Sequence, residues 1–111
     1  MKTILLTPYP GRVILCKTLA ELGRAYRAHT GDKCPEKWAL EPCDGRTITL
    51  AHHSAQTPRY LVYGKNAPSL AHEFGHVLLE HFEYIGSNPA EGNGEPFCYA
   101  MSHLMHEALK K

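Results

Sequence analysis

One helical segment restricts the fold of this chain more than any other feature. Asn66 can cap its start, Pro68 falls in the first turn, where a missing N–H costs little, and Gly86 can end it. Apolar residues recur at helical spacing along it: Leu70, Phe74, Val77, Leu78 and Ile85. The pattern predicts a helix over residues 67–84 that buries one face.

His72, Glu73 and His76 lie on the same helix, and its apolar residues cluster on the side opposite both histidines. Because residues four apart share a face, two imidazoles can reach one zinc ion at about 2.0–2.1 Å. Glu73 lies about 100° around the axis, where it can act as a general base on a water molecule bound to that ion. Gly75 costs the helix about 1 kcal/mol relative to Ala, which suggests close packing at that point.

A catalytic zinc site usually has three protein ligands and one open position. Glu95 is the favoured third ligand, because it begins a helix expected over residues 95–109, after a loop long enough to bring that helix back antiparallel. Tyr99 lies one turn further on, and its hydroxyl could stabilise the tetrahedral intermediate. The alternative for Glu95 is a first-turn glutamate that interacts favourably with the helix dipole. The alternative for Tyr99 is an aromatic side chain that only packs.

Other candidate ligands fit the site less well. His81 lies about 180° around the helix from His72, which predicts a partly buried, hydrogen-bonded histidine. Glu91 stands in a glycine-rich stretch that would hold a ligand poorly, and the spacing of Cys34 and Cys43 fits no standard zinc site. The histidines expected at the surface are His52, His53, His103 and His106.

Charge and hydrophobicity indicate which kinds of partner and which cellular compartment to expect. The net charge is +1, and no run of Lys or Arg exceeds two residues, which argues against a nucleic-acid partner. The apolar stretch before Pro8 is too short for a signal peptide, and none approaches the roughly 18 residues of a membrane span. We therefore expect a cytoplasmic protein with no membrane partner, in which the cysteines are free thiols.

The rest of the chain predicts an α+β fold, and its 111 residues suit a single domain over residues 1–111. A first helix is expected over residues 18–29, from an N-cap at Thr18 to a stop at Gly31. The expected strands are a hairpin of residues 46–50 and 59–63, with weaker candidates at 3–6 and 12–16.

Residues 69–81 read Ser-Leu-Ala-His-Glu-Phe-Gly-His-Val-Leu-Leu-Glu-His. This stretch resembles the active-site helix of the ImmA/IrrE-type peptidases and minimal gluzincins, typically Thr-Leu-Ala-His-Glu-Leu-Gly-His. Their third ligand is a glutamate at the head of a later helix, which here corresponds to Glu95 in a looser match over residues 95–105. The resemblance implies a small zincin core: an N-terminal helix, a short antiparallel or mixed sheet, an active-site helix and a C-terminal helix. It also implies an extended substrate along an edge strand.

Two functions are compatible with these residues. The first is a zinc endopeptidase that acts on a protein or peptide, such as a regulatory protein, with Glu73 as general base. The second is a non-enzymatic binding or regulatory module in which zinc only joins two helices. Glu73 favours the enzyme, because a purely structural site needs no base and is normally closed by a fourth ligand.

Overall fold

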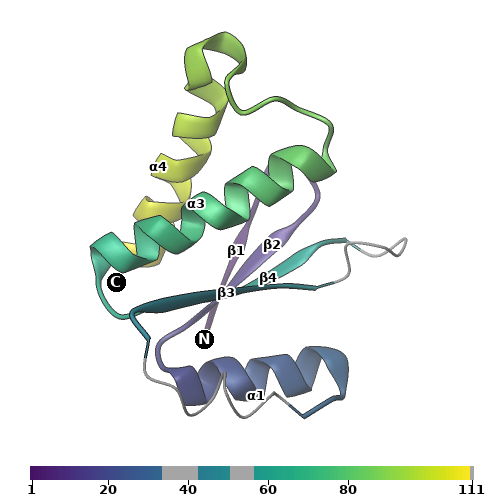
Figure 1. The fold of residues 1–111 in the computed structure, drawn as a ribbon, viewed down its shortest axis with the longest axis vertical. Helices are drawn as coiled ribbons and strands as arrows, with labels where there is room; N and C mark the ends of the chain where they lie inside the picture. Colours follow the sequence, from purple (N-terminus) through teal and green to yellow (C-terminus); the bar gives the residue numbers. More distant parts are fainter. Residues whose placement is uncertain (34–42, 51–56, 111) are drawn as a thin grey trace.

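The computed structural model describes residues 1–33, 43–50 and 57–110. In this part of the chain, helices cover both faces of a four-stranded sheet, so the predicted α+β fold is confirmed (Figure 1). The strands are β1 (Lys2–Leu5), β2 (Arg12–Cys16), β3 (Gly45–Leu50) and β4 (Arg59–Gly64). The helices are α1 (Leu19–Thr30), α3 (Ala67–Tyr84) and α4 (Glu95–Leu109), and a 3-10 turn, η1 (Glu91–Gly94), precedes α4.

The sheet is mixed, with the strand order β1-β2-β4-β3. Strand β1 pairs with β2 antiparallel, β2 pairs with β4 parallel, and β3 pairs with β4 antiparallel. The predicted hairpin is therefore confirmed, and both weaker strand candidates belong to the same sheet. Strand β3 lies at an edge, where no other strand in the described part of the chain pairs with its outer side.

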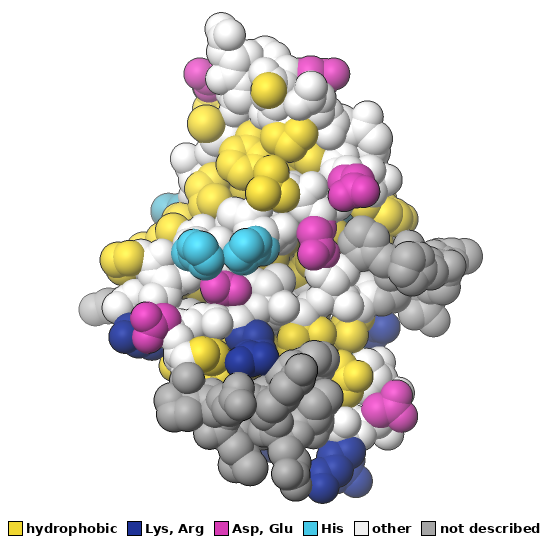
Figure 2. Space-filling view, viewed as in Figure 1, with side chains coloured by type: hydrophobic (Ala, Val, Ile, Leu, Met, Phe, Trp, Pro, Cys, Tyr) yellow, Lys and Arg dark blue, Asp and Glu magenta, His cyan; other side chains and the backbone are white. Residues whose placement is uncertain are grey.

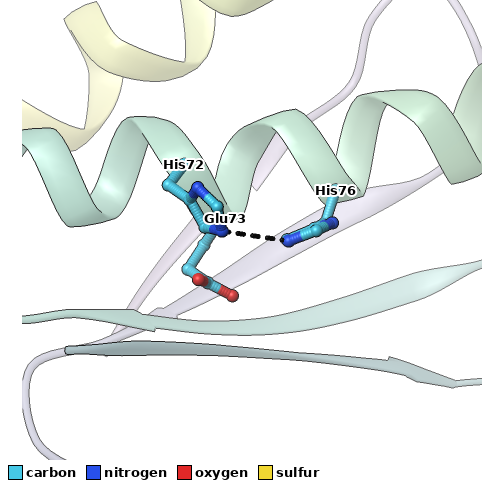
Figure 3. Close-up of side chains that lie close together, drawn as sticks. All are labelled: His72, Glu73 and His76. Atoms are coloured by element: carbon cyan, nitrogen blue, oxygen red, sulfur yellow. Dashed lines mark hydrogen bonds between the residues drawn. The ribbon is translucent and has the colours of Figure 1, made fainter. Parts of the chain in front are cut away.

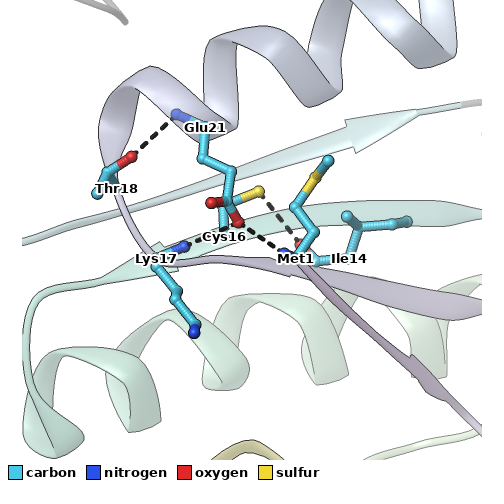
Figure 4. Close-up of polar contacts among 6 residues, drawn as sticks. All are labelled: Met1, Ile14, Cys16, Lys17, Thr18 and Glu21. Atoms are coloured by element: carbon cyan, nitrogen blue, oxygen red, sulfur yellow. Dashed lines mark hydrogen bonds and ion pairs between the residues drawn. The ribbon is translucent and has the colours of Figure 1, made fainter.

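Polar contacts fix the start of α1 (Figure 4). The Thr18 hydroxyl accepts a hydrogen bond from the Glu21 N–H at 3.0 Å, as expected of an N-cap. The Glu21 carboxylate accepts from the Lys17 N–H at 3.3 Å and forms an ion pair with the α-amino group of Met1 at 3.1 Å. At the other end of α1, Gly31 adopts a left-handed conformation with φ 78°, so the predicted stop is confirmed.

The sheet separates two clusters of buried side chains. One lies between α1 and the sheet: Ile14, Cys16, Leu22, Ala25, Ile48, Leu50 and Leu61. The other includes the buried face of α3 and extends to Leu104 of α4. The rings of Phe82 and Phe97, 5.6 Å apart, join the end of α3 to the start of α4. No helix of the described residues has the length and apolar character needed to span a membrane.

Helix α3 begins at an N-cap formed by Asn66, whose side chain accepts from the Ser69 N–H at 2.9 Å. It then passes very close to the end of β4. A Cβ atom at Gly64 would lie 2.7 Å from both the backbone nitrogen and the Cα of Leu70. Gly64 therefore sets how closely α3 approaches the sheet.

The close packing expected at Gly75 is wrong. A Cβ atom there would meet no described atom within 4 Å outside its own helical neighbourhood. The helix turns this position towards open space, so its glycine carries the cost in helix propensity without a packing contact to compensate within this part of the chain.

We expect opposite effects from the same substitution at these two glycines. Gly64→Ala should lower the free energy of unfolding by about 1–3 kcal/mol, because backbone atoms must move to admit the methyl group. Gly75→Ala should raise it by about 0.5–1 kcal/mol through helix propensity alone. Urea denaturation of both variants measures the difference, and destabilisation of similar size at both positions would contradict the packing described.

Candidate metal centre

The two histidines of α3 lie side by side at the surface (Figure 2). One helical turn separates His72 from His76, and their Nε2 atoms are 3.2 Å apart. The ring planes are inclined at 83°, with centroids 4.9 Å apart. Both nitrogen atoms point into the same space beside the helix (Figure 3).

This separation fits a shared metal ion. Two nitrogen ligands at 2.0–2.1 Å from a tetrahedral zinc ion lie about 3.3 Å apart. The observed 3.2 Å matches that spacing, and it is also a hydrogen-bond distance between two neutral imidazoles. The distance between the two nitrogen atoms is therefore already the one that a shared ion requires.

Glu73 is buried next to these exposed histidines, with a relative exposure of 8%. Its carboxylate lies within 4.8 Å of the ligand atoms of the pair. The Thr47 hydroxyl on β3 donates to Oε1 of Glu73 at 2.9 Å. Gly45 lies close as well, since a Cβ atom there would be 2.8 Å from the Glu73 Cγ.

Sequence reasoning did not identify Gly45 and Thr47 as part of the site. Their one signal in the sequence is the alternation of β3, which places both on one face of the strand. Which face meets α3, and at which residue, depends on how the helix crosses the sheet. The structure supplies that information through the contact of Gly64 with Leu70.

Two open hollows flank Glu73, between α3 and the edge strand β3. The first has a volume of about 470 Å³ and is lined by Asp44, Gly45, Pro68, Ser69, His72 and Glu73. The second has a volume of about 350 Å³ and is lined by Gly45, Arg46, Thr47, Glu73, His76 and Glu80. Because Gly45 and Glu73 line both, the hollows lie on either side of the contact between these two residues, one beside each histidine. The two hollows together are called the groove beside β3.

The structure does not bring Glu95, the expected third ligand, to this cluster. Among the described residues, only His72, Glu73 and His76 bring three potential ligand atoms close enough together to hold one metal ion. The start of α4 packs beside the end of α3, through the contact of Phe82 with Phe97. At about 1.5 Å per residue, Phe82 is roughly 15 Å along α3 from His72 and roughly 9 Å from His76. The predicted antiparallel return of α4 is present, but it leaves Glu95 at the far end of α3.

Tyr99 is also not placed at the histidines. It is 73% exposed and borders a different hollow, between the β1–β2 turn and α4. That hollow has a volume of about 370 Å³, and none of the three clustered residues lines it. The position therefore does not match the expected role of Tyr99 in stabilising the intermediate.

His81 is hydrogen-bonded, as predicted, but it is fully and not partly buried. This histidine is 1% exposed, on the sheet side of α3, and its Nδ1 atom is 3.0 Å from the Tyr60 hydroxyl. The β1–β2 turn packs onto the same ring, since a Cβ atom at Gly11 would lie 2.6 Å from the His81 Cε1. His81 thus joins helix, sheet and turn, and it faces away from the candidate metal centre.

The remaining histidines and cysteines do not enlarge the cluster. His106 is exposed, and His103 is partly buried with its Nε2 atom 3.2 Å from the Leu5 carbonyl oxygen. The cysteines in the described ranges are free thiols, and burial raises the pKa of Cys16 to about 11. The residues of the earlier predictions that lie outside the described ranges are Cys34, His52 and His53.

Comparison with known proteins adds no assignment. No protein-family model matches the chain, and no curated protein or solved structure matches it.

We expect the histidine pair to bind one equivalent of zinc. At a free zinc concentration 100 times the dissociation constant, binding should stabilise the fold by about 2.7 kcal/mol. His72→Ala and His76→Ala should each lose this stabilisation, whereas the exposed control His106→Ala should keep it. Glu95→Gln should also keep it, because the structure holds Glu95 away from the pair. Calorimetric titration and thermal unfolding measure both effects, and zinc binding that survives His72→Ala would contradict the site.

Proposed function

We propose that this protein is a zinc-dependent endopeptidase. The single observation that carries the proposal is the Nε2 separation of 3.2 Å between His72 and His76, with the Glu73 carboxylate in the same cluster. This arrangement lies in a groove open to a substrate, beside an edge strand. The resemblance of residues 69–81 to the active-site helix of the ImmA/IrrE-type peptidases agrees with it.

The residues of the cluster divide the chemistry between them. His72 and His76 would hold the zinc ion through their Nε2 atoms. When bound, zinc would polarise the scissile carbonyl and lower the pKa of a water molecule towards about 7. The Glu73 carboxylate would take a proton from the attacking water and pass it to the leaving amine, as a general base and then a general acid.

The outer edge of β3, which pairs with no other strand of the described residues, suits an extended peptide. The Lys65 N–H donates to the Asp44 carbonyl oxygen at 2.9 Å, so this pair belongs to the hydrogen-bonded set of the β3–β4 ladder. Because hydrogen-bonded and non-bonded pairs alternate in an antiparallel ladder, the backbone groups of Gly45 and Thr47 point away from β4. A peptide that pairs with those groups would run along the groove past the histidines.

An apolar surface beside the histidines supports a peptide substrate with apolar side chains. Figure 2 shows hydrophobic side chains over α3 and α4 next to the histidine pair. Leu79, three residues after His76 and seven after His72, is 53% exposed on this side of α3. An extended peptide held along β3 would therefore have polar backbone partners on one side and apolar surface on the other.

One observation also favours a second function, a zinc-stabilised binding module without catalysis. The Glu73 carboxylate is close enough to the histidines to serve as the third ligand itself. In that arrangement Glu73 would be occupied by the ion and could not transfer protons. The two functions make different demands on this one side chain.

The substitution Glu73→Gln distinguishes the two functions. As a general base, Glu73 should be dispensable for zinc, so Glu73→Gln should keep its zinc affinity and lose at least about 100-fold in turnover. If Glu73 is a zinc ligand, Glu73→Gln should lose zinc affinity instead. Peptide-library cleavage followed by mass spectrometry measures turnover, with the exposed Glu83→Gln on the same helix as control. Wild-type turnover in Glu73→Gln would refute the catalytic role.

A further inference from the structure

We propose that Thr47 is a positioning residue for Glu73: its hydroxyl fixes the carboxylate so that one oxygen remains available for proton transfer. The inference rests on the proposed function and concerns the same groove. In this proposal β3 contributes a side chain that orients Glu73, in addition to backbone groups that bind a peptide.

The Thr47 hydroxyl makes two contacts with Glu73. It lies 2.9 Å from Oε1 of the carboxylate and 3.3 Å from the backbone carbonyl oxygen of the same residue. A hydroxyl carries one proton to donate, and the shorter contact, to a charged acceptor, is the stronger bond. The contact with the backbone oxygen also keeps the hydroxyl beside the turn of α3 that carries Glu73. Oε1 is therefore engaged, and Oε2 is the oxygen left to accept a proton.

Gly45 closes the other side of this arrangement. A Cβ atom at Gly45 would lie 2.8 Å from Cγ and 3.0 Å from Oε2 of Glu73. The side chain thus lies directly against the strand backbone at Gly45. Since Glu73 is 8% exposed, water competes weakly for the hydrogen bond from Thr47. These contacts hold the carboxylate beside the histidines before any ligand binds.

The chain offers a matched control for this hydrogen bond. Two residues further along β3, the Thr49 hydroxyl donates to Oε2 of Glu80 on α3. Thr49→Val therefore breaks a second threonine–glutamate bond between the same strand and the same helix, without touching Glu73. If only Thr47→Val loses activity, the loss is due to the orientation of Glu73. If both variants lose activity, it is due to weaker packing between β3 and α3.

The experiment compares the zinc-loaded wild type with Thr47→Val, Thr47→Ser and Thr49→Val. Thr47→Val, which keeps the shape but lacks the hydroxyl, should lower kcat by at least about tenfold, as supporting hydrogen-bond partners of metal sites do. KM and zinc affinity should change by less than about twofold, because substrate and zinc contact other groups. Thr47→Ser should restore kcat, and Thr49→Val should leave it unchanged. Full activity in Thr47→Val, or an equal loss in Thr49→Val, would overturn the proposal.

A second measurement does not depend on turnover. The carboxyl ¹³C resonance of Glu73 in zinc-free protein can be assigned from its absence in Glu73→Gln. It should shift in Thr47→Val and stay at the wild-type position in Thr47→Ser and Thr49→Val. An unchanged resonance in Thr47→Val would show that the hydroxyl does not orient the carboxylate. If the wild type cleaves no peptide, the proposed function fails, and this resonance alone decides the role of Thr47.

Discussion

Helix α3 meets the sheet at two points where a glycine leaves space for it. At Gly64 the backbone of Leu70 occupies the volume of a side chain, and at Gly45 the side chain of Glu73 does so. A methyl group added at Gly64 would have to displace the backbone of Leu70, and one added at Gly45 would have to displace the side chain of Glu73. The distance between helix and edge strand, and with it the width of the groove, follows from these two positions.

The chemistry proposed for the groove depends on α3, which exposes its two histidines to solvent and buries Glu73 against the sheet. His72 and Glu73 are neighbours in sequence, but the turn of about 100° per residue exposes the imidazole and buries the carboxylate. The two histidines are exposed, so an ion from solution would have access to them. The buried carboxylate contacts the hydroxyl of Thr47, which would keep it in one orientation. A candidate ion site and a buried carboxylate therefore lie within one turn of α3, against one strand.

The sequence predicts those parts of the site that depend on local rules. Capping at Asn66, helical periodicity and the four-residue spacing of the histidines locate α3 and the histidine pair without tertiary information. Thr47 could not be found in this way, because it lies 26 residues before Glu73 and meets it only through the crossing of helix and sheet. The sequence placed Glu95 at the metal centre incorrectly for the same reason: its position depends on tertiary packing. The loop length predicts an antiparallel return but not that Phe97 docks beside Phe82, far from the histidines.

We propose that His72 and His76 share one metal ion in the groove beside β3. Anomalous diffraction at the zinc edge, from crystals grown with one equivalent of zinc, tests it most directly. We expect a single strong peak about 2.0–2.1 Å from the Nε2 atom of each histidine, with Glu73 close by but not coordinated. A zinc peak at cysteine sulfur, or no peak beside a histidine pair that remains hydrogen-bonded, would contradict it.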